Sequence, residues 1–177
     1  MAGRAGLRQV VFLRNVNQGQ RGHPSTADIL SAFADAGYPD AATYRSNGTV
    51  VVNAEIDDEG VADVVAALAV RSGEKRSALR LPMAELSAIV RRFGDEPARR
   101  ELTVHAAGAV AADDPRLRDE AERWGCRVLG AGDGWVVSAH DRDEGVSATP
   151  ALEQVTGMPA TSRGLRTIVG LVSRFGD

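Results

Sequence analysis

The stretch ATYRSNGTVVVNA, residues 42–54, carries the strongest structural signal in the chain. Asn47-Gly48 is the residue pair that tight type I′ turns favour, because both central positions of such a turn need a positive φ. Threonine, tyrosine and valine, which favour strands, flank the pair on both sides. The stretch therefore predicts a β-hairpin that turns at Asn47-Gly48.

The residues before this hairpin predict a strand followed by a helix. Residues 7–13 form a short run rich in valine, leucine and phenylalanine, which is typical of a buried strand. A helix begins at Ser25 or Thr26, where Asp28 is placed to complete a capping box, and Gly37 closes it. A strand, a polar loop and a helix thus lead into the hairpin.

The residues after the hairpin predict a second helix and a further strand. The helix covers residues 57–72, has acidic residues in its first turn and ends at Gly73. A short strand follows over residues 77–81. The resulting order, βαββαβ, is the ferredoxin-like arrangement.

The second half of the chain repeats this order in outline. We predict a linking helix over 83–94, a strand over 101–108, a helix over 114–125, a hairpin over 126–139 that turns at Asp133-Gly134, and helices over 150–157 and 162–175. The expected fold class is α+β, with two ferredoxin-like βαββα units, an internal duplication and a C-terminal helix. Residues 1–82 would form the first unit, and residues 83–177 the linking helix, the second unit and the C-terminal helix. Residues 140–150 are expected to form a polar loop.

Composition places the chain among globular proteins. Of its 177 residues 44% are hydrophobic and 25% charged, and its formal net charge is −3. This balance disfavours a non-specific nucleic-acid binder, which usually carries excess basic charge. Cys126 is the single cysteine, so no internal disulfide can form. No apolar run approaches a membrane span, and the N-terminus resembles a strand more than a signal peptide, so we expect a soluble cytoplasmic protein.

The first quarter of the chain resembles the family of the domain of unknown function numbered 1697, a set of uncharacterised, mostly bacterial α/β proteins. Its members open with a strand ending L-R-G-I-N-V-G-G, then carry a helix with M-A-D-L and a hairpin T-Y-I-Q-S-G-N-V-V-F. The matching residues here are Leu13, Arg14, Asn17, Gly19, Ala27, Asp28, Gly37, Thr43, Tyr44, Gly48, Val50 and Val51. Near the C-terminus, Thr161, Arg163 and Thr167 match a T-x-R-N-W pattern followed by threonine.

Several positions depart from the family pattern. Asn15 stands where the family has glycine, Gln20 replaces the second glycine of a pair, and Thr49 replaces the hairpin asparagine. Gly164 and Leu165 replace the closing Asn-Trp pair. The resemblance implies the fold but no reaction, because the family has no established activity.

The loop after the first strand is the best candidate for a ligand site. It contains Arg14, Asn15, Asn17 and Gly19 and leads into the N-terminus of a helix. Ligands of α/β proteins often bind beyond the carboxyl ends of strands, and a helix N-terminus with an arginine suits an anion. The alternative is that Arg14 pairs with Asp28 and that the asparagine side chains form hydrogen bonds with the backbone of turns. The loop would then be an ordinary polar connection between the strand and the helix.

A second arginine is a candidate for the same site. Thr161 and Ser162 resemble helix caps, which would place Arg163 in the first turn of the last helix. A cation there opposes the helix dipole, and a bound anion would offset that cost. We therefore expect Arg163 to approach the cleft that holds Arg14, unless it pairs with a carboxylate such as Glu153.

Catalytic and metal-binding patterns are absent from the sequence. There is no G-x-S-x-G, H-E-x-x-H or Walker A motif, and the three histidines lack metal-ligand spacing, so we expect neither a bound metal nor a cofactor. A dyad of Cys126 with His105 or His140 is conceivable, although both Cys126 and His105 are better explained as buried structural residues.

Two classes of function remain. The first is binding, with turnover left open, of a small anionic metabolite at the loop after the first strand. The second is a nucleic-acid or protein-interaction module that uses a sheet face or a basic edge. Residues 71–76 are the densest basic run, and we interpret them as a solvated helix end whose cations suit the negative end of the helix dipole. The pair Gly19 and Gly22 lies in the wrong context for a KH domain, and the strands lack the aromatics of RNA-binding sheets. The oligomeric state and the ligand are open.

Overall fold

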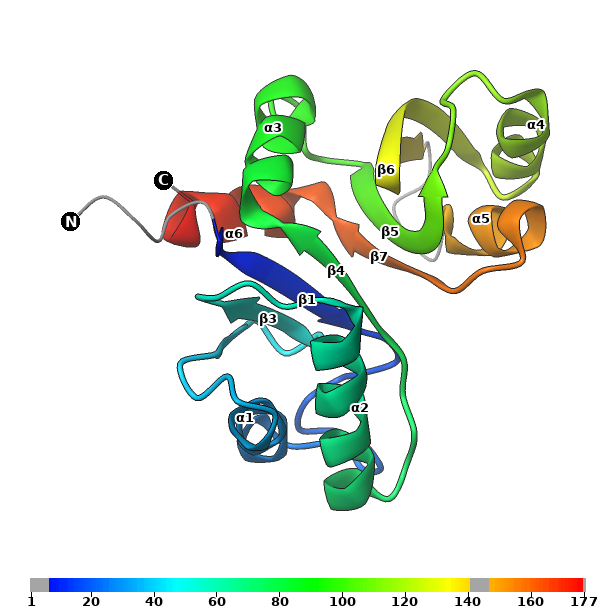
Figure 1. The fold of residues 1–177 in the computed structure, drawn as a ribbon. Helices are drawn as coiled ribbons and strands as arrows, with labels where there is room; N and C mark the ends of the chain where they lie inside the picture. The colour runs from blue at the N-terminus through cyan, green and yellow to red at the C-terminus, as the bar shows by residue number, and fades with distance from the viewer. Residues whose placement is uncertain (1–6, 141–146, 177) are drawn as a thin grey trace. The chain divides into compact units, whose positions relative to one another are not determined.

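The computed structural model describes residues 7–140 and 147–176, and the chain forms two units, residues 7–84 and residues 85–176 (Figure 1). The first unit has the predicted βαββαβ order, made of β1 (Gln9–Leu13), α1 (Thr26–Asp35), β2 (Ala42–Tyr44), β3 (Thr49–Val52), α2 (Asp58–Ser72) and β4 (Ala78–Pro82).

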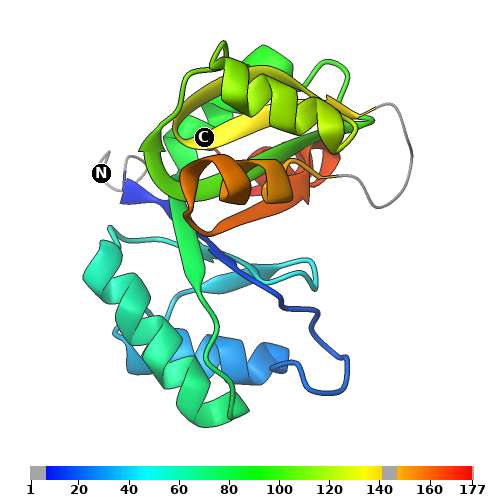
Figure 2. The ribbon, with the colours of Figure 1, turned by 90° about the vertical axis from the view of Figure 1, so that its right-hand side faces the viewer.

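The first unit is built on a four-stranded antiparallel sheet with the order β2-β3-β1-β4. Strand β1 is central, so Val11 lies opposite Val50 of β3 on one side and Arg80 of β4 on the other. Helices α1 and α2 cover one face of the sheet (Figures 1 and 2). The core between them is aliphatic and aromatic, and includes Val11, Leu13, Ile29, Phe33, Val50, Val52, Val64 and Leu68.

Local hydrogen bonds set the ends of both helices. Ser25 caps α1: its Oγ accepts from the Asp28 N–H at 3.1 Å, and the Asp28 carboxylate accepts from the Ser25 N–H at 3.0 Å. The predicted capping box is therefore confirmed. Asp57 caps α2 by accepting from the Gly60 N–H at 2.8 Å, and Gly73 ends α2 in the left-handed conformation.

The hairpin between β2 and β3 forms, but its turn differs from the predicted two-residue type I′ turn. Tyr44 pairs with Thr49, so the loop has the four residues 45–48, and Arg45 and Gly48 take positive φ angles of 61° and 75°. The four-residue loop is hydrogen-bonded to the end of β1 and the segment after it. The Gly48 carbonyl accepts from the Leu13 N–H at 2.8 Å, and the Ser46 carbonyl accepts from the Gln18 N–H at 2.8 Å. These bonds fasten the hairpin loop to the segment that follows β1.

The second unit contains a three-stranded antiparallel sheet with the order β6-β5-β7. Helix α3 (Met83–Phe93), the predicted linking helix, begins at the end of the first unit. It is followed by β5 (Arg100–Ala109), α4 (Pro115–Arg123), β6 (Cys126–His140), α5 (Thr149–Thr156), β7 (Ala160–Gly164) and α6 (Leu165–Phe175). The two units share the α+β class, but their element orders differ, and an internal duplication is not confirmed.

The predicted turn at Asp133-Gly134 is wrong. Asp133 pairs with Ala109 of β5, so it lies within the sheet and not at the tip of a hairpin. Residues 126–140 form a single strand, β6, and the contacts of its two ends show that it is strongly bent. Fully extended, Cys126 and Ser138 would lie about 40 Å apart, yet Cys126 packs in one cluster with Ala148, whose N–H donates to Glu101, the residue opposite Ser138 in the sheet.

Side chains pack on both faces of the second sheet. On one face, Leu117 of α4 and Leu152 of α5 pack against Val136 of β6 and Ala160 of β7. On the other, the rings of Phe93 and Trp135 meet edge to face, 6.3 Å between centroids, and the Trp135 Nε1–H donates to Glu85 at 2.7 Å. The predicted loop at 140–150 lies largely outside the described residues.

Candidate functional site

Arg14 lies at the carboxyl end of β1, as the sequence predicts. Its backbone N–H donates to the Ser77 carbonyl at 2.9 Å, and its guanidinium Nη1 donates to the Ser77 Oγ at 3.2 Å. The side chain is half-buried. Asp28, the expected partner of Arg14 in the structural alternative, is instead used in the capping box of α1. Ser77, just before β4, therefore orients this arginine.

The two asparagines shape the loop backbone. Asn15 has a φ of 53°, in the left-handed region that asparagine tolerates better than most residues. The Asn17 N–H donates to His23 Nδ1 at 3.1 Å, and the Asn17 carbonyl accepts from the Gln20 N–H at 3.2 Å. A neutral His23 therefore keeps its proton on Nε2. Both asparagine side chains are exposed.

Gly19 and Gly22 make turns in this loop. Their φ angles are 84° and 82°, and a Cβ added at either position would meet nothing within 4 Å. The two glycines are therefore needed for backbone conformation and not for a close approach of another part of the chain.

A residue that the sequence did not single out holds the loop in place. Arg76 is 8% exposed, and its guanidinium donates to the Asn15 carbonyl at 3.3 Å and the Gly22 carbonyl at 2.9 Å. The same group pairs with Glu74 at 2.6 Å. We interpreted the basic run 71–76 as a solvated helix end, and this is wrong for Arg76. No local pattern predicts its loop contacts, because Asn15 and Gly22 lie more than fifty positions earlier in the chain.

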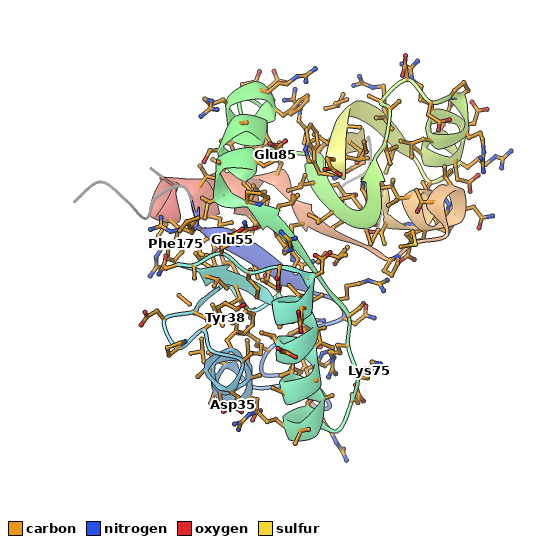
Figure 3. The ribbon with its side chains drawn as sticks, viewed as in Figure 1. Asp35, Tyr38, Glu55, Lys75, Glu85 and Phe175 are labelled. Carbon is orange, nitrogen blue, oxygen red and sulfur yellow. The ribbon has the colours of Figure 1, made fainter. Side chains whose placement is uncertain are left out.

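Four basic residues lie in the loop after β1 and in the connection between α2 and β4 that contacts it. Arg14 and Arg21 come from the loop, while Lys75 and Arg76 come from the connection between α2 and β4, on which Figure 3 marks Lys75. Arg21 and Lys75 are exposed. Glu74 balances Arg76, so the loop keeps a net positive charge.

Arg163 is not in a helix. It lies in β7, where it pairs with Leu102 of β5, and α6 begins after Gly164 without a side-chain cap. The predicted conflict with a helix dipole is therefore wrong. Its Nη1 donates to Thr161 Oγ1 at 2.9 Å and to the Ser162 carbonyl at 2.8 Å, and burial lowers the pKa of the guanidinium to about 10. Arg14 belongs to the first unit and Arg163 to the second, and a site shared by both stays a prediction.

The buried titratable groups of the second unit do not form an activated dyad. Burial, with the nearby Glu101 carboxyl, raises the pKa of the Cys126 thiol to about 11, the opposite of what a nucleophile needs. Burial also lowers the pKa of His105, whose Nδ1 accepts from the Ala107 N–H at 3.3 Å. Among the described residues, no three metal-ligating side chains come together.

Glu101 gives a prediction about pH. Burial raises the pKa of its carboxyl, against the opposing effects of the Ala148 N–H, His140 and Ser162. The folded protein thus holds this proton more tightly than the unfolded chain, so the stabilisation is full below the usual carboxyl pKa and is lost as pH rises through the raised pKa. We expect Glu101→Gln to become progressively more stable than the wild type as pH is raised from about 4 to about 8.

Urea titrations across this pH range will measure the effect. The amide oxygen that the substitution introduces can still accept from the Ala148 N–H, which Glu101 bonds at 2.7 Å. Glu55→Gln, at an exposed position labelled in Figure 3, is the matched control. Wild-type and Glu101→Gln stabilities that change in parallel with pH would show that this carboxyl does not titrate abnormally.

The comparisons with known proteins come from family models and solved structures. The model described as a protein of unknown function, DUF1697, matches residues 7–123. The chain belongs to the DUF1697 family. A conserved bacterial protein from Streptococcus pneumoniae is similar in structure, with a TM-score of 0.63 and 14% sequence identity over 96% of this chain and 98% of that chain. A search of curated proteins found no match.

These comparisons fix the family and the fold of this DUF1697 protein but assign no activity, so its function is unknown. Fold likeness at this identity does not carry function. The structure does explain one departure from the family pattern: Asn15 replaces a glycine at a left-handed position and keeps the backbone conformation. Within the described residues no helix is long and apolar enough to span a membrane.

Proposed function

We propose that this DUF1697 protein binds a small anionic metabolite at the loop after β1, with turnover left open. The observation that carries the proposal is that one arginine is held in position at the start of this loop while a second arginine is hydrogen-bonded to the loop backbone. Ser77 holds the Arg14 guanidinium half-buried at the end of β1, while Arg76 fixes the loop backbone through two carbonyls. A cation positioned in advance binds a carboxylate or phosphate without first losing side-chain entropy.

The proposed anion is bound by side chains and not by the N-terminus of α1. The capping box uses the N–H groups of Ser25 and Asp28, and the Asp28 carboxylate already places negative charge at that helix end. Arg14 and the exposed Arg21 are the proposed ligand contacts, with Asn15, Asn17 and Gly19 shaping the loop. Arg163 remains a proposed further contact.

The strand order of the first unit supports a ferredoxin-like arrangement for that unit. β1 lies between β3 and β4, and each crossover helix packs on the same face of the sheet. This arrangement brings the carboxyl end of β1 next to the segment that enters β4, which is why Arg14 meets Ser77.

The alternative, a nucleic-acid or protein-interaction module, has less support. All residues of the central strands β1 and β3 are buried, so these strands present no exposed sheet face. The basic edge around Arg21 and Lys75 is the surface that such a module would use. Binding of heparin, a polyanion, distinguishes the two functions. An extended basic edge would bind heparin far more tightly than it binds a small anion, because a polyanion contacts several basic residues at once.

A thermal-shift screen over nucleotides, sugar phosphates and carboxylates tests the proposed function. A ligand that binds only the folded state raises the melting temperature. We expect Arg14→Ala to abolish the shift that a positive compound gives, while Arg91→Ala, which removes an exposed arginine from α3, leaves it unchanged. A shift that persists in Arg14→Ala would remove this loop as the site.

A further inference from the structure

The second unit has a surface pocket of about 330 Å³ at the junction of α4 and β6. Its lining residues are Arg118, Glu122, Gly125, Cys126, Arg127 and Val128. This volume lies at the lower end of the range of small-molecule sites. Arg118 and Glu122 come from the helix, and Cys126, Arg127 and Val128 from the strand, so two elements with separate backbone anchors form the walls.

Two positively charged side chains meet at this pocket. Across residues 7–140 and 147–176, neither the Arg118 nor the Arg127 side chain has a hydrogen-bond or ion-pair partner. Glu122 lies one helical turn after Arg118 but does not bridge it. Two guanidinium groups at one pocket repel each other, and an anion between them would replace that repulsion with charge-assisted hydrogen bonds.

Cys126 is a buried residue of the lining, 4% exposed, and its thiol adds no negative charge to the pocket. Burial, with the nearby Glu101 carboxyl, raises the thiol pKa to about 11, which keeps the sulfur neutral at physiological pH.

We propose that this pocket binds a small organic anion that also carries a hydroxyl or ammonium group. Arg118 and Arg127 take the phosphate or carboxylate oxygens, and the Glu122 carboxylate accepts from the second group. The site is separate from the loop after β1 and does not depend on the function proposed for that loop.

Isothermal titration with glycerol 2-phosphate and with malate tests the proposal and distinguishes phosphate from carboxylate. Both probes pair an anion with a hydroxyl. We expect saturable binding of at least one probe, and a loss of at least about tenfold in affinity in Arg118→Ala and in Arg127→Ala. Arg116→Ala, which removes an exposed arginine of α4 that does not line the pocket, is the matched control and should bind as the wild type does.

Two further variants and one chemical readout place the binding. Arg14→Ala should not change the affinity of either probe. Failure of the pocket proposal and failure of the function proposed for the loop after β1 are therefore distinguishable. Because Cys126 is the only cysteine and is one of the lining residues, the neutral reagent 4,4′-dithiodipyridine reacts at this residue alone. Saturating probe should slow this reaction in the wild type but not in the Arg118→Ala/Arg127→Ala double variant.

The opposite results are equally clear. Absence of binding of both probes to the wild type would overturn the proposal, as would affinities unchanged by both arginine substitutions. Binding lost in Arg14→Ala and kept in Arg118→Ala would move the anion to the loop after β1. Calorimetry alone decides if the thiol proves unreactive.

Discussion

Gly48→Ala will destabilise the protein by about 3 kcal/mol or more, because the new methyl group has no space and the backbone conformation is unfavourable. The φ of Gly48 is 75°, and a Cβ there would lie 2.9 Å from the Leu13 carbonyl oxygen and 2.9 Å from the Val16 Cβ. The carbonyl belongs to the central strand β1 and cannot move without breaking the sheet. Urea unfolding of the two proteins measures the difference.

Gly73→Ala is the matched control for this substitution. Gly73 has almost the same φ, 74°, but a Cβ there would meet nothing within 4 Å. We expect this variant to lose only about 1 kcal/mol, the cost of a left-handed alanine. Equal losses in the two variants would show that the contact with β1 does not restrict position 48.

Arg76→Met will lower the free energy of unfolding by about 2–3 kcal/mol and will loosen the loop after β1. Methionine keeps most of the buried stem but leaves the Asn15 and Gly22 carbonyls and the Glu74 carboxylate without their donor. Arg76→Lys should recover only part of the loss, since one ammonium group lacks the fork that reaches several acceptors.

Two measurements separate the global effect from the local one. Urea unfolding gives the stability, and amide hydrogen exchange over residues 14–25 gives the protection of the loop. Lys75→Met, at the exposed neighbouring position, should change stability by less than about 0.5 kcal/mol. An Arg76→Met protein with wild-type exchange in this loop would mean that other contacts hold it.

The sequence predicted the features that depend on near neighbours. The capping box of Ser25 and Asp28 and the helix end at Gly73 involve residues within one turn, so the residue types alone report them. The family pattern around Arg14 likewise predicted the end of β1. Wherever a distant segment decides the structure, the prediction was incomplete.

Three errors show this dependence on distant partners. Thr161 and Ser162 resemble helix caps, but both residues are part of β7 and pair with β5. The Ser162 hydroxyl is also hydrogen-bonded to the Thr103 hydroxyl at 2.7 Å. Asp133-Gly134 has turn-forming residues, yet Asp133 pairs with Ala109. Arg76 lies in a basic run but becomes buried, because the loop carbonyls that it bonds arrive from the other end of the unit.

The bond from Arg76 to Asn15 spans 61 positions of sequence, and this separation has a consequence for how the protein is made. A ribosome releases the N-terminal strand and its loop long before it synthesises the arginine that organises them. The loop can reach its final shape only after α2 has formed and the chain has turned back towards β4. Nascent chains arrested before position 76 should therefore have an unprotected loop, and the proposed anion site should form only after Arg76 has left the ribosome.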